Sequence, residues 1–160
     1  MTESPPPLSL NLHEQPCFAL FTTANAVTRA YRELLDPLGL TYTQYLVMLS
    51  LWERDGVSLH ALSAHTLLDS PTLTPVVRRL QAKGLVSRAR AGDDVRRLVI
   101  TVTPAALELR ERARPIPDAM LCRVGLSADD ERTLGRLLAE MRAALAPAAH
   151  IPPDQQRAST

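Results

Sequence analysis

The sequence predicts a mainly α-helical fold in which a helix-turn-helix is followed by a two-stranded β-hairpin. Apolar residues recur at helical spacing over most of the chain, whereas residues 85–103 change to the alternation typical of strands. Prolines, glycines and hydroxyl residues stand where helix ends are expected. Aromatic residues make up only 4% of a chain that is 46% hydrophobic, which suits a core of packed aliphatic helices.

Two helices are expected in the first third of the chain. The first spans residues 16–36, with a proline in its first turn and Pro37 as its stop. Its positions 17, 21, 24, 28, 31 and 35 form a heptad-like stripe. The second begins after Thr41, because TYTQ matches a capping box in which Thr41 and Gln44 cap each other's backbone.

A helix-turn-helix is expected next. Ser58 caps a short helix, and a longer helix follows with Ser70 at its start and Gly84 as its stop. Pro75 removes one backbone donor from the longer helix, so Thr74 is expected to act as a second cap.

Basic charge is concentrated on the longer helix and on the hairpin, which pairs LVSRAR with LVITV around an AGDD turn. Residues 78–97 contain seven basic residues and only two acidic ones, Asp93 and Asp94, so this segment has a net charge of +5 in a chain of net charge +1. The seven are Arg78, Arg79, Lys83, Arg88, Arg90, Arg96 and Arg97. An isolated cluster is usually only a solvated surface, but this one coincides with the elements that contact phosphates, which favours DNA binding.

One folded domain is expected over residues 13–146, with a proline-rich flexible arm over 1–12 and a disordered tail over 147–160. A helix that breaks at Pro115 and Pro117, and another that begins at Ser127, close this domain. No signal peptide is visible, and no apolar run approaches the roughly 20 residues of a membrane helix. With only two cysteines, the expected location is the reducing cytoplasm.

Motifs for cofactors or enzymatic chemistry are absent from the sequence. His60 and His65 have no metal-ligand companions, and there is no phosphate loop or serine triad. We therefore expect neither a metal nor a cofactor.

Three segments in the same order resemble the MarR family of winged-helix regulators, and within it the organic-hydroperoxide-sensing OhrR branch of the two-cysteine type. They are CFALF, LLDPLGLTYTQYLVMLSLWE and LDSPTLTPVVRRLQAKGLVSR, and DDVRRLVITVT on the wing supports them. The resemblance covers roughly residues 11–145. It implies a homodimeric repressor, not an enzyme, that binds palindromic operator DNA and releases it when an organic hydroperoxide oxidises a cysteine. Interleaved terminal dimerisation helices, also implied, suit the apolar character of those helices.

The resemblance places the sensing thiol at Cys17, hydrogen-bonded by Tyr31 and Tyr42, and a resolving thiol at Cys122. Cys17 falls in the first turn of a helix, whose partial positive charge favours the thiolate that attacks peroxides. Tyr31 lies roughly 21 Å further along the same helix, so it can reach Cys17 only from the partner in an antiparallel dimer. A packing role stays open for both cysteines, since free cysteines are commonly buried.

The residues expected to contact DNA lie on the longer helix of the helix-turn-helix and at the wing tip. They are Ser70, Thr72, Thr74, Arg78, Arg79 and Arg96, with Asp94 orienting Arg96. Hydroxyls suit phosphates and base edges, and arginine suits guanine or a narrow minor groove. Simple phosphate attraction is an alternative role for Arg78 and Arg79.

Three positions depart from the OhrR pattern: Phe21 replaces a frequent tyrosine, Pro71 a glycine, and Pro16 an aliphatic residue. Two other functions stay open. One is a thiol peroxidase, although no thioredoxin-like strand pattern surrounds Cys17 and the basic helix would have no purpose. The other is a MarR-type sensor of a small aromatic ligand without thiol chemistry.

Overall fold

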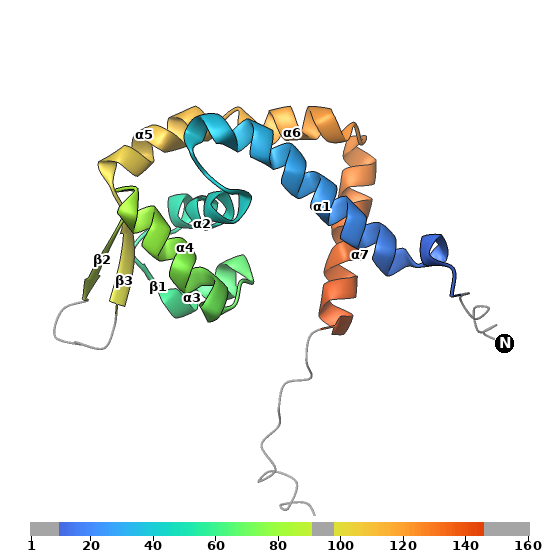
Figure 1. Cartoon of the computed structure of the whole chain (residues 1–160), viewed down its shortest axis with the longest axis horizontal. Helices are drawn as coiled ribbons and strands as arrows, with labels where there is room; N and C mark the ends of the chain where they lie inside the picture. Colours follow the sequence, from blue (N-terminus) through green and yellow to red (C-terminus); the bar gives the residue numbers. More distant parts are fainter. Residues whose placement is uncertain (1–9, 91–97, 146–160) are drawn as a thin grey trace, which may run out of the picture. The chain divides into compact units, whose positions relative to one another are not determined.

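The computed structural model describes residues 10–90 and 98–145, which form two compact units, one ending at Met120 and the other beginning at Leu121 (Figure 1). In chain order the elements are η1 (Leu12–Glu14), α1 (Pro16–Leu35), η2 (Asp36–Leu38), α2 (Tyr42–Glu53), β1 (Val57–Ser58), α3 (Leu59–Thr66), α4 (Ser70–Ala82), β2 (Val86–Arg90), β3 (Leu98–Val102), α5 (Pro104–Ala113), α6 (Ile116–Val124) and α7 (Ala128–Leu145). Most of the predicted arm, the AGDD turn and the predicted tail lie outside the described residues.

The predicted capping residues of α2 and α3 act as expected. Thr41 Oγ1 accepts the amide of Gln44 at 3.3 Å, and Gln44 Oε1 accepts the amide of Thr41 at 3.2 Å, which completes the capping box. Ser58 and Thr103 likewise accept a backbone amide from the first turns of α3 and α5. Each cap satisfies a helix donor that would otherwise have no partner.

The predicted cap of α4 is wrong. Asp69 accepts the amide of Thr72 at 2.9 Å, so Ser70 is the first helical residue and not the cap. Thr74 is not a second cap, because its hydroxyl donates to the carbonyl of Ser70 at 2.8 Å within the helix. An aspartate competes well for this position, since its carboxylate also interacts favourably with the positive end of the helix.

The wing sheet has three strands where the sequence predicted two. β2 pairs with β3, with Arg88 opposite Ile100, and β1 pairs with the other edge of β3, with Val57 opposite Ile100. Asp55, just before β1, accepts the amide of Val102 at 2.8 Å and extends this attachment. The third strand could not be predicted because two residues carry no periodicity.

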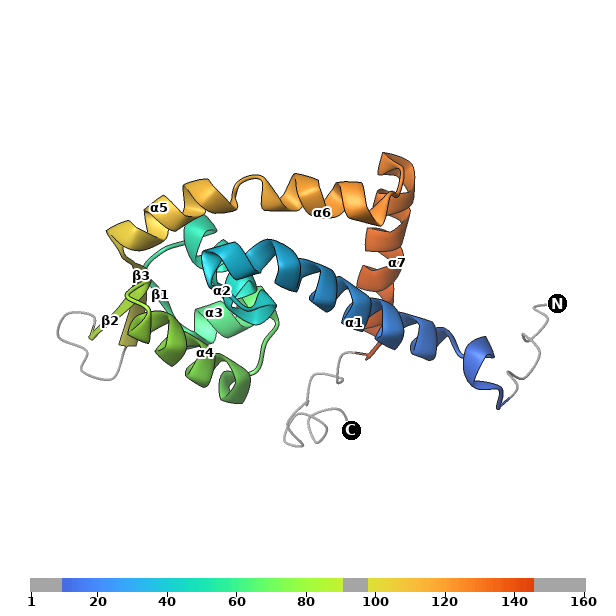
Figure 2. The ribbon, with the colours of Figure 1, turned by 45° about the horizontal axis from the view of Figure 1, so that its top comes forward.

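Helix α2 lies between α5 on one side and α3 and α4 on the other (Figure 2). The core that surrounds it draws on α1, α2, α3, α4 and β3. Its largest fully buried side chains are Tyr45, Leu35, Met48, Leu51, Leu62, Leu73, Leu80, Ile100, Val47 and Val77. The helix-turn-helix, the wing and the end of α1 therefore share one core.

Three helices, where the sequence predicted two, follow the wing. The predicted break after α5 is present, but Pro117 is the second residue of the new helix α6, where its missing N–H costs nothing. Cys122 therefore lies in the last turn of α6. Ser127 accepts the amide of Asp130 at the start of α7. No helix within the described ranges is long and apolar enough to cross a membrane.

Candidate functional site

The two tyrosines predicted to serve the sensing thiol come together from α1 and α2. The rings of Tyr31 and Tyr42 stack, with centroids 4.3 Å apart and planes 19° apart. Tyr45 lies one turn along α2, 5.9 Å from Tyr31, and Trp52 approaches Tyr45 edge-on at 6.4 Å. The spacing of Tyr45 from Tyr42 is that of two residues on one helix face.

Burial favours the neutral form of all three phenols. Removal from water raises the pKa of Tyr31 above its ordinary value. The same desolvation, with Tyr31 nearby, raises the pKa of Tyr42 and raises the pKa of Tyr45 to about 12. A neutral phenol carries an O–H that can donate to an anion such as a thiolate.

Cys17 is the second residue of α1, and its side chain is exposed. Pro16 occupies the first helical position, which has no need of its N–H. Along α1, Cys17 and Tyr31 are separated by roughly 21 Å, as the sequence predicted. The structure therefore pairs Tyr31 with Tyr42 but does not bring Cys17 to them within one chain. Cys122, in the second unit, is also an exposed free thiol.

Helix α4 exposes four of the residues predicted to contact DNA: Ser70, Thr72, Arg78 and Arg79. Thr74 is half-buried, and its hydroxyl is already used within the helix. The opposite face is apolar and buried through Leu73, Val76, Val77 and Leu80. The amphipathic pattern thus orients the arginines away from the core. Asp94 and Arg96 lie outside the described residues.

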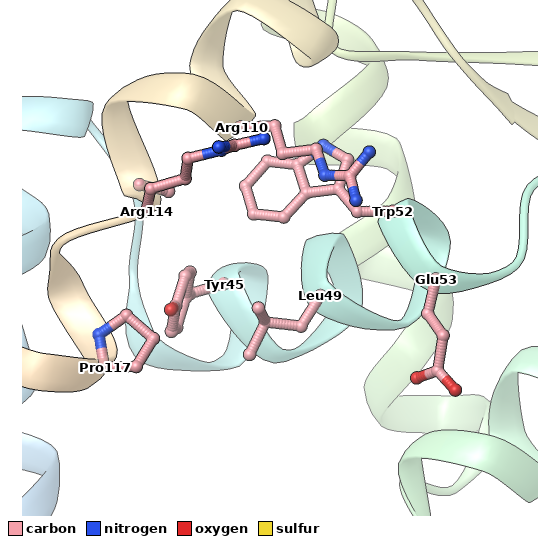
Figure 3. Close-up of a pocket in the computed structure, with 8 residues that line it drawn as sticks. Tyr45, Leu49, Trp52, Glu53, Arg110, Arg114 and Pro117 are labelled. Carbon is pink, nitrogen blue, oxygen red and sulfur yellow. The ribbon is translucent and has the colours of Figure 1, made fainter.

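A pocket of about 580 Å³ opens beside Tyr45 (Figure 3). It is lined by Tyr45, Leu49, Trp52, Glu53, Arg110, Ala113, Arg114 and Pro117. The indole N–H of Trp52 donates to the carbonyl of Ala106 at 3.0 Å, which fixes one wall. In Figure 3, Arg110 and Arg114 extend along the side of the pocket opposite Tyr45 and Leu49. The sequence did not predict this pocket, because its walls come from helices far apart in the chain.

A family model described as "Transcriptional regulator SarA/Rot" matches residues 29–112, which contain the helix-turn-helix and the wing. The chain belongs to the MarR/SarA family of winged-helix transcriptional regulators. It is therefore a DNA-binding regulator and not an enzyme, and the predicted winged-helix fold is confirmed.

Two sequence relatives support this assignment. The regulator TtmR of Methylorubrum extorquens is 42% identical over 132 residues, which cover 82% of this chain and 68% of TtmR. The organic hydroperoxide resistance transcriptional regulator of Bacillus subtilis is 37% identical over 128 residues, which cover 80% of this chain and 85% of that protein.

Solved structures of AbfR, a protein of Staphylococcus epidermidis, are also similar. Reduced AbfR bound to DNA matches with a TM-score of 0.75 and 31% identity over 85% of this chain and 95% of AbfR. Overoxidized AbfR bound to DNA matches with a TM-score of 0.69 and 30% identity over 84% and 95% of the two chains.

The aromatic cluster makes stability sensitive to alkaline pH. All three tyrosines of the chain belong to it, so ultraviolet absorbance should show them ionising above the ordinary value of about 10, the last near pH 12. A phenol whose pKa is higher in the folded state stabilises the fold below its unfolded pKa and loses that effect as pH rises through the folded value. The free energy of unfolding should therefore fall between about pH 10 and 12.

Denaturant unfolding at stepped pH measures this fall, and Tyr45→Phe is the matched variant because it removes the phenol that titrates last. Its unfolding free energy should depend less on pH over the same range. Folded protein whose tyrosines all ionise near the ordinary value would contradict this account.

Proposed function

We propose that the protein is a repressor that senses organic hydroperoxides through Cys17. The observation that carries this proposal is the stacked pair of Tyr31 and Tyr42, two neutral phenols held together by different helices. The similarity to the Bacillus subtilis organic hydroperoxide resistance regulator supports it. The similarity to AbfR also supports it, because AbfR has structures in a reduced and in an overoxidized form.

The sensing site is proposed to be completed in a homodimer. Helix α1 exposes Leu20 and Phe21, and α7 has no buried residue at all. On α7 the exposed leucines Leu134, Leu137 and Leu138 lie at helical spacing. Apolar faces of this kind are typical of protein interfaces. An antiparallel meeting of two α1 helices would bring Cys17 of one protomer to the tyrosine pair of its partner.

The proposed oxidation of Cys17 has two steps. The Cys17 thiolate attacks a peroxide oxygen, the O–O bond breaks, and the departing alkoxide takes up a proton to leave as an alcohol, so that sulfur is oxidised to a sulfenic acid. The thiol of Cys122 then attacks this sulfur, a disulfide forms and water leaves. Hydroxyl donors from Tyr31 and Tyr42 stabilise the thiolate before the first step.

Release of DNA is proposed to follow from the disulfide between subunits. A dimer presents two α4 helices, and their spacing has to match one helical turn of DNA. A covalent bond between Cys17 and the partner's Cys122 would pull on the dimerisation helices and change that spacing. In this proposal Ser70, Thr72, Thr74, Arg78 and Arg79 contact DNA from α4, and Arg96, oriented by Asp94, contacts it from the wing.

The pocket beside Tyr45 favours a second candidate function, the sensing of a small aromatic anion. Aromatic rings line it, and so do Arg110 and Arg114, although Glu53 is also in the lining and Arg114 is paired with Glu111 at 2.9 Å. The sulfur of Cys17 distinguishes the two candidates, because only the peroxide sensor needs it.

The first test concerns DNA. The protein should bind a two-fold symmetric, A·T-rich duplex as a dimer, with log affinity falling by about 0.9 per neutralised phosphate for each unit of log salt. Arg78→Ala and Arg79→Ala should weaken binding, and losing a phosphate contact should make the slope shallower by about 0.9. Fluorescence anisotropy at several salt concentrations measures both. Arg132→Ala, which removes a charge paired with Asp129 on α7, is the control and should keep the slope. A monomer in sizing experiments, or binding independent of salt, would refute this.

The second test concerns Cys17. Cys17→Ser should bind DNA as the wild type does but should stay bound after addition of an organic hydroperoxide, because serine keeps the shape and lacks the oxidisable sulfur. Tyr31→Phe and Tyr42→Phe should slow release about tenfold or more, since each removes a donor to an anion. Anisotropy measured before and after peroxide addition decides between the outcomes. Peroxide-induced release of Cys17→Ser would overturn the proposal.

The third test concerns Cys122. After peroxide treatment, wild-type protein should run as a covalent dimer on a non-reducing gel, and a reductant should reverse this. Cys122→Ser should lose that band and leave Cys17 open to over-oxidation, which mass spectrometry detects. If wild-type protein releases DNA without forming a covalent dimer, Cys122 has no resolving role.

A further inference from the structure

Lys83 joins the end of α4 to the beginning of α2. It is the C-cap residue of α4, and its Nζ donates to Gln44 Oε1 at 2.9 Å and to the carbonyl of Gly39. Gln44 is 3% exposed and belongs to the α2 capping box, so its Oε1 accepts from Lys83 and from the amide of Thr41 at once. Gly39 lies in the turn just before α2, with φ of +66°. One ammonium group therefore ties two acceptors on α2 and its leading turn to α4.

The same end of α4 is attached to α5. Thr103, the N-cap residue of α5, donates through Oγ1 to the carbonyl of Gly84 at 2.7 Å, and its amide donates to Leu85 at 3.1 Å. The carboxyl end of α4 is thus a junction of three helices, whereas its amino end carries the exposed Ser70 and Thr72.

The acceptors of Lys83 adjoin the tyrosine pair. Tyr42 is the first residue of α2, directly after the Thr41 cap, and stacks on Tyr31. A displacement of Tyr42 therefore moves the first turn of α2, which holds Gln44. The residue type also fits this role, because lysine is a compact charge with three donors, whereas arginine presents a planar fork. Lys83 is the one lysine among the 18 lysine and arginine residues of the chain.

We infer that Lys83 is a positioning residue that transmits the state of the tyrosine pair to the recognition helix α4. While Tyr31 and Tyr42 stack, the ammonium holds α4 in its DNA-binding orientation. When a change at the sensing site displaces Tyr42, the acceptors shift and α4 shifts with them. This inference rests on the proposed function for the identity of the signal, but the attachment itself can be tested without peroxide.

Reduced Lys83→Met should bind DNA about tenfold more weakly, because charged hydrogen bonds are lost while the aliphatic stem stays. The probe is a short duplex selected from random sequences by reduced wild-type protein. The salt dependence separates two roles: a tether leaves the slope unchanged, whereas a phosphate contact makes it shallower by about 0.9, as expected for Arg79→Met. A shallower slope for Lys83→Met, or unchanged affinity, would overturn the inference.

A double-mutant cycle with Gln44→Met identifies the partner. Gln44→Met keeps the charge of Lys83 and removes its side-chain acceptor, so it should also weaken DNA binding. The double variant should lose clearly less affinity than the sum of the two single losses, because both substitutions break the Lys83–Gln44 hydrogen bond. Losses that simply add would count against the tether.

Transmission is measured in DNA-free, reduced protein. With nitrogen-15 lysine, the side-chain ammonium gives a single magnetic resonance signal, since the chain has one lysine. Tyr42→Ala should shift this signal, and Tyr31→Leu serves if the first variant does not fold. Leu107→Ala, exposed on α5, is the control and should leave the signal in place. An ammonium signal whose chemical shift is the same in both tyrosine variants as in the wild type would refute transmission. Failure of wild-type protein to release DNA with peroxide would instead refute the proposed function and leave this readout intact.

Discussion

The burial of α2 is the constraint on which the rest of the fold depends. Half of this 12-residue helix is buried, including two polar side chains, Gln44 and Ser50. A buried polar group without a partner is costly, so each must be satisfied by a neighbour. Gln44 Oε1 accepts a hydrogen bond from Lys83 at the end of α4. The hydroxyl oxygen of Ser50 lies 2.6 Å from Nδ1 of His65 on α3. The polar residues of α2 therefore position both helices of the helix-turn-helix, in addition to the apolar packing around them.

This arrangement places the proposed sensing elements and the DNA-binding elements on one helix. The first turn of α2 carries Tyr42, its middle carries Tyr45, and its last turns form a wall of the pocket. The opposite side of the helix packs against α3 and α4. A displacement of Tyr42 or Tyr45 therefore acts on a helix that itself contacts the recognition helix α4. Such proximity suits a regulator in which a chemical event at one atom has to change the geometry of a whole domain.

Local signals were the most predictable part of the structure. The caps at Thr41 and Ser58 depend on neighbouring residues and were predicted correctly. Ser70 was wrong as the cap of α4, because Asp69 beside it is an equally competent cap. Strand β1 and the pocket could not be predicted, since each needs partners that are distant in the chain. The pairing of Tyr31 with Tyr42 came from family resemblance, because spacing alone cannot bring α1 and α2 together. The role of Cys17, of Cys122 and of the wing-tip Arg96 stays a prediction.

The aromatic cluster has a practical consequence for spectroscopy. The three tyrosines and the single tryptophan of the chain all belong to it, with Trp52 edge-on to Tyr45 at 6.4 Å. The remaining aromatic rings are two phenylalanines, which absorb and emit weakly in the near ultraviolet. The intrinsic fluorescence and the near-ultraviolet circular dichroism of this protein therefore originate almost entirely from one small region. The chain carries its own optical reporter at the proposed sensing site, so events there can be followed in unlabelled protein.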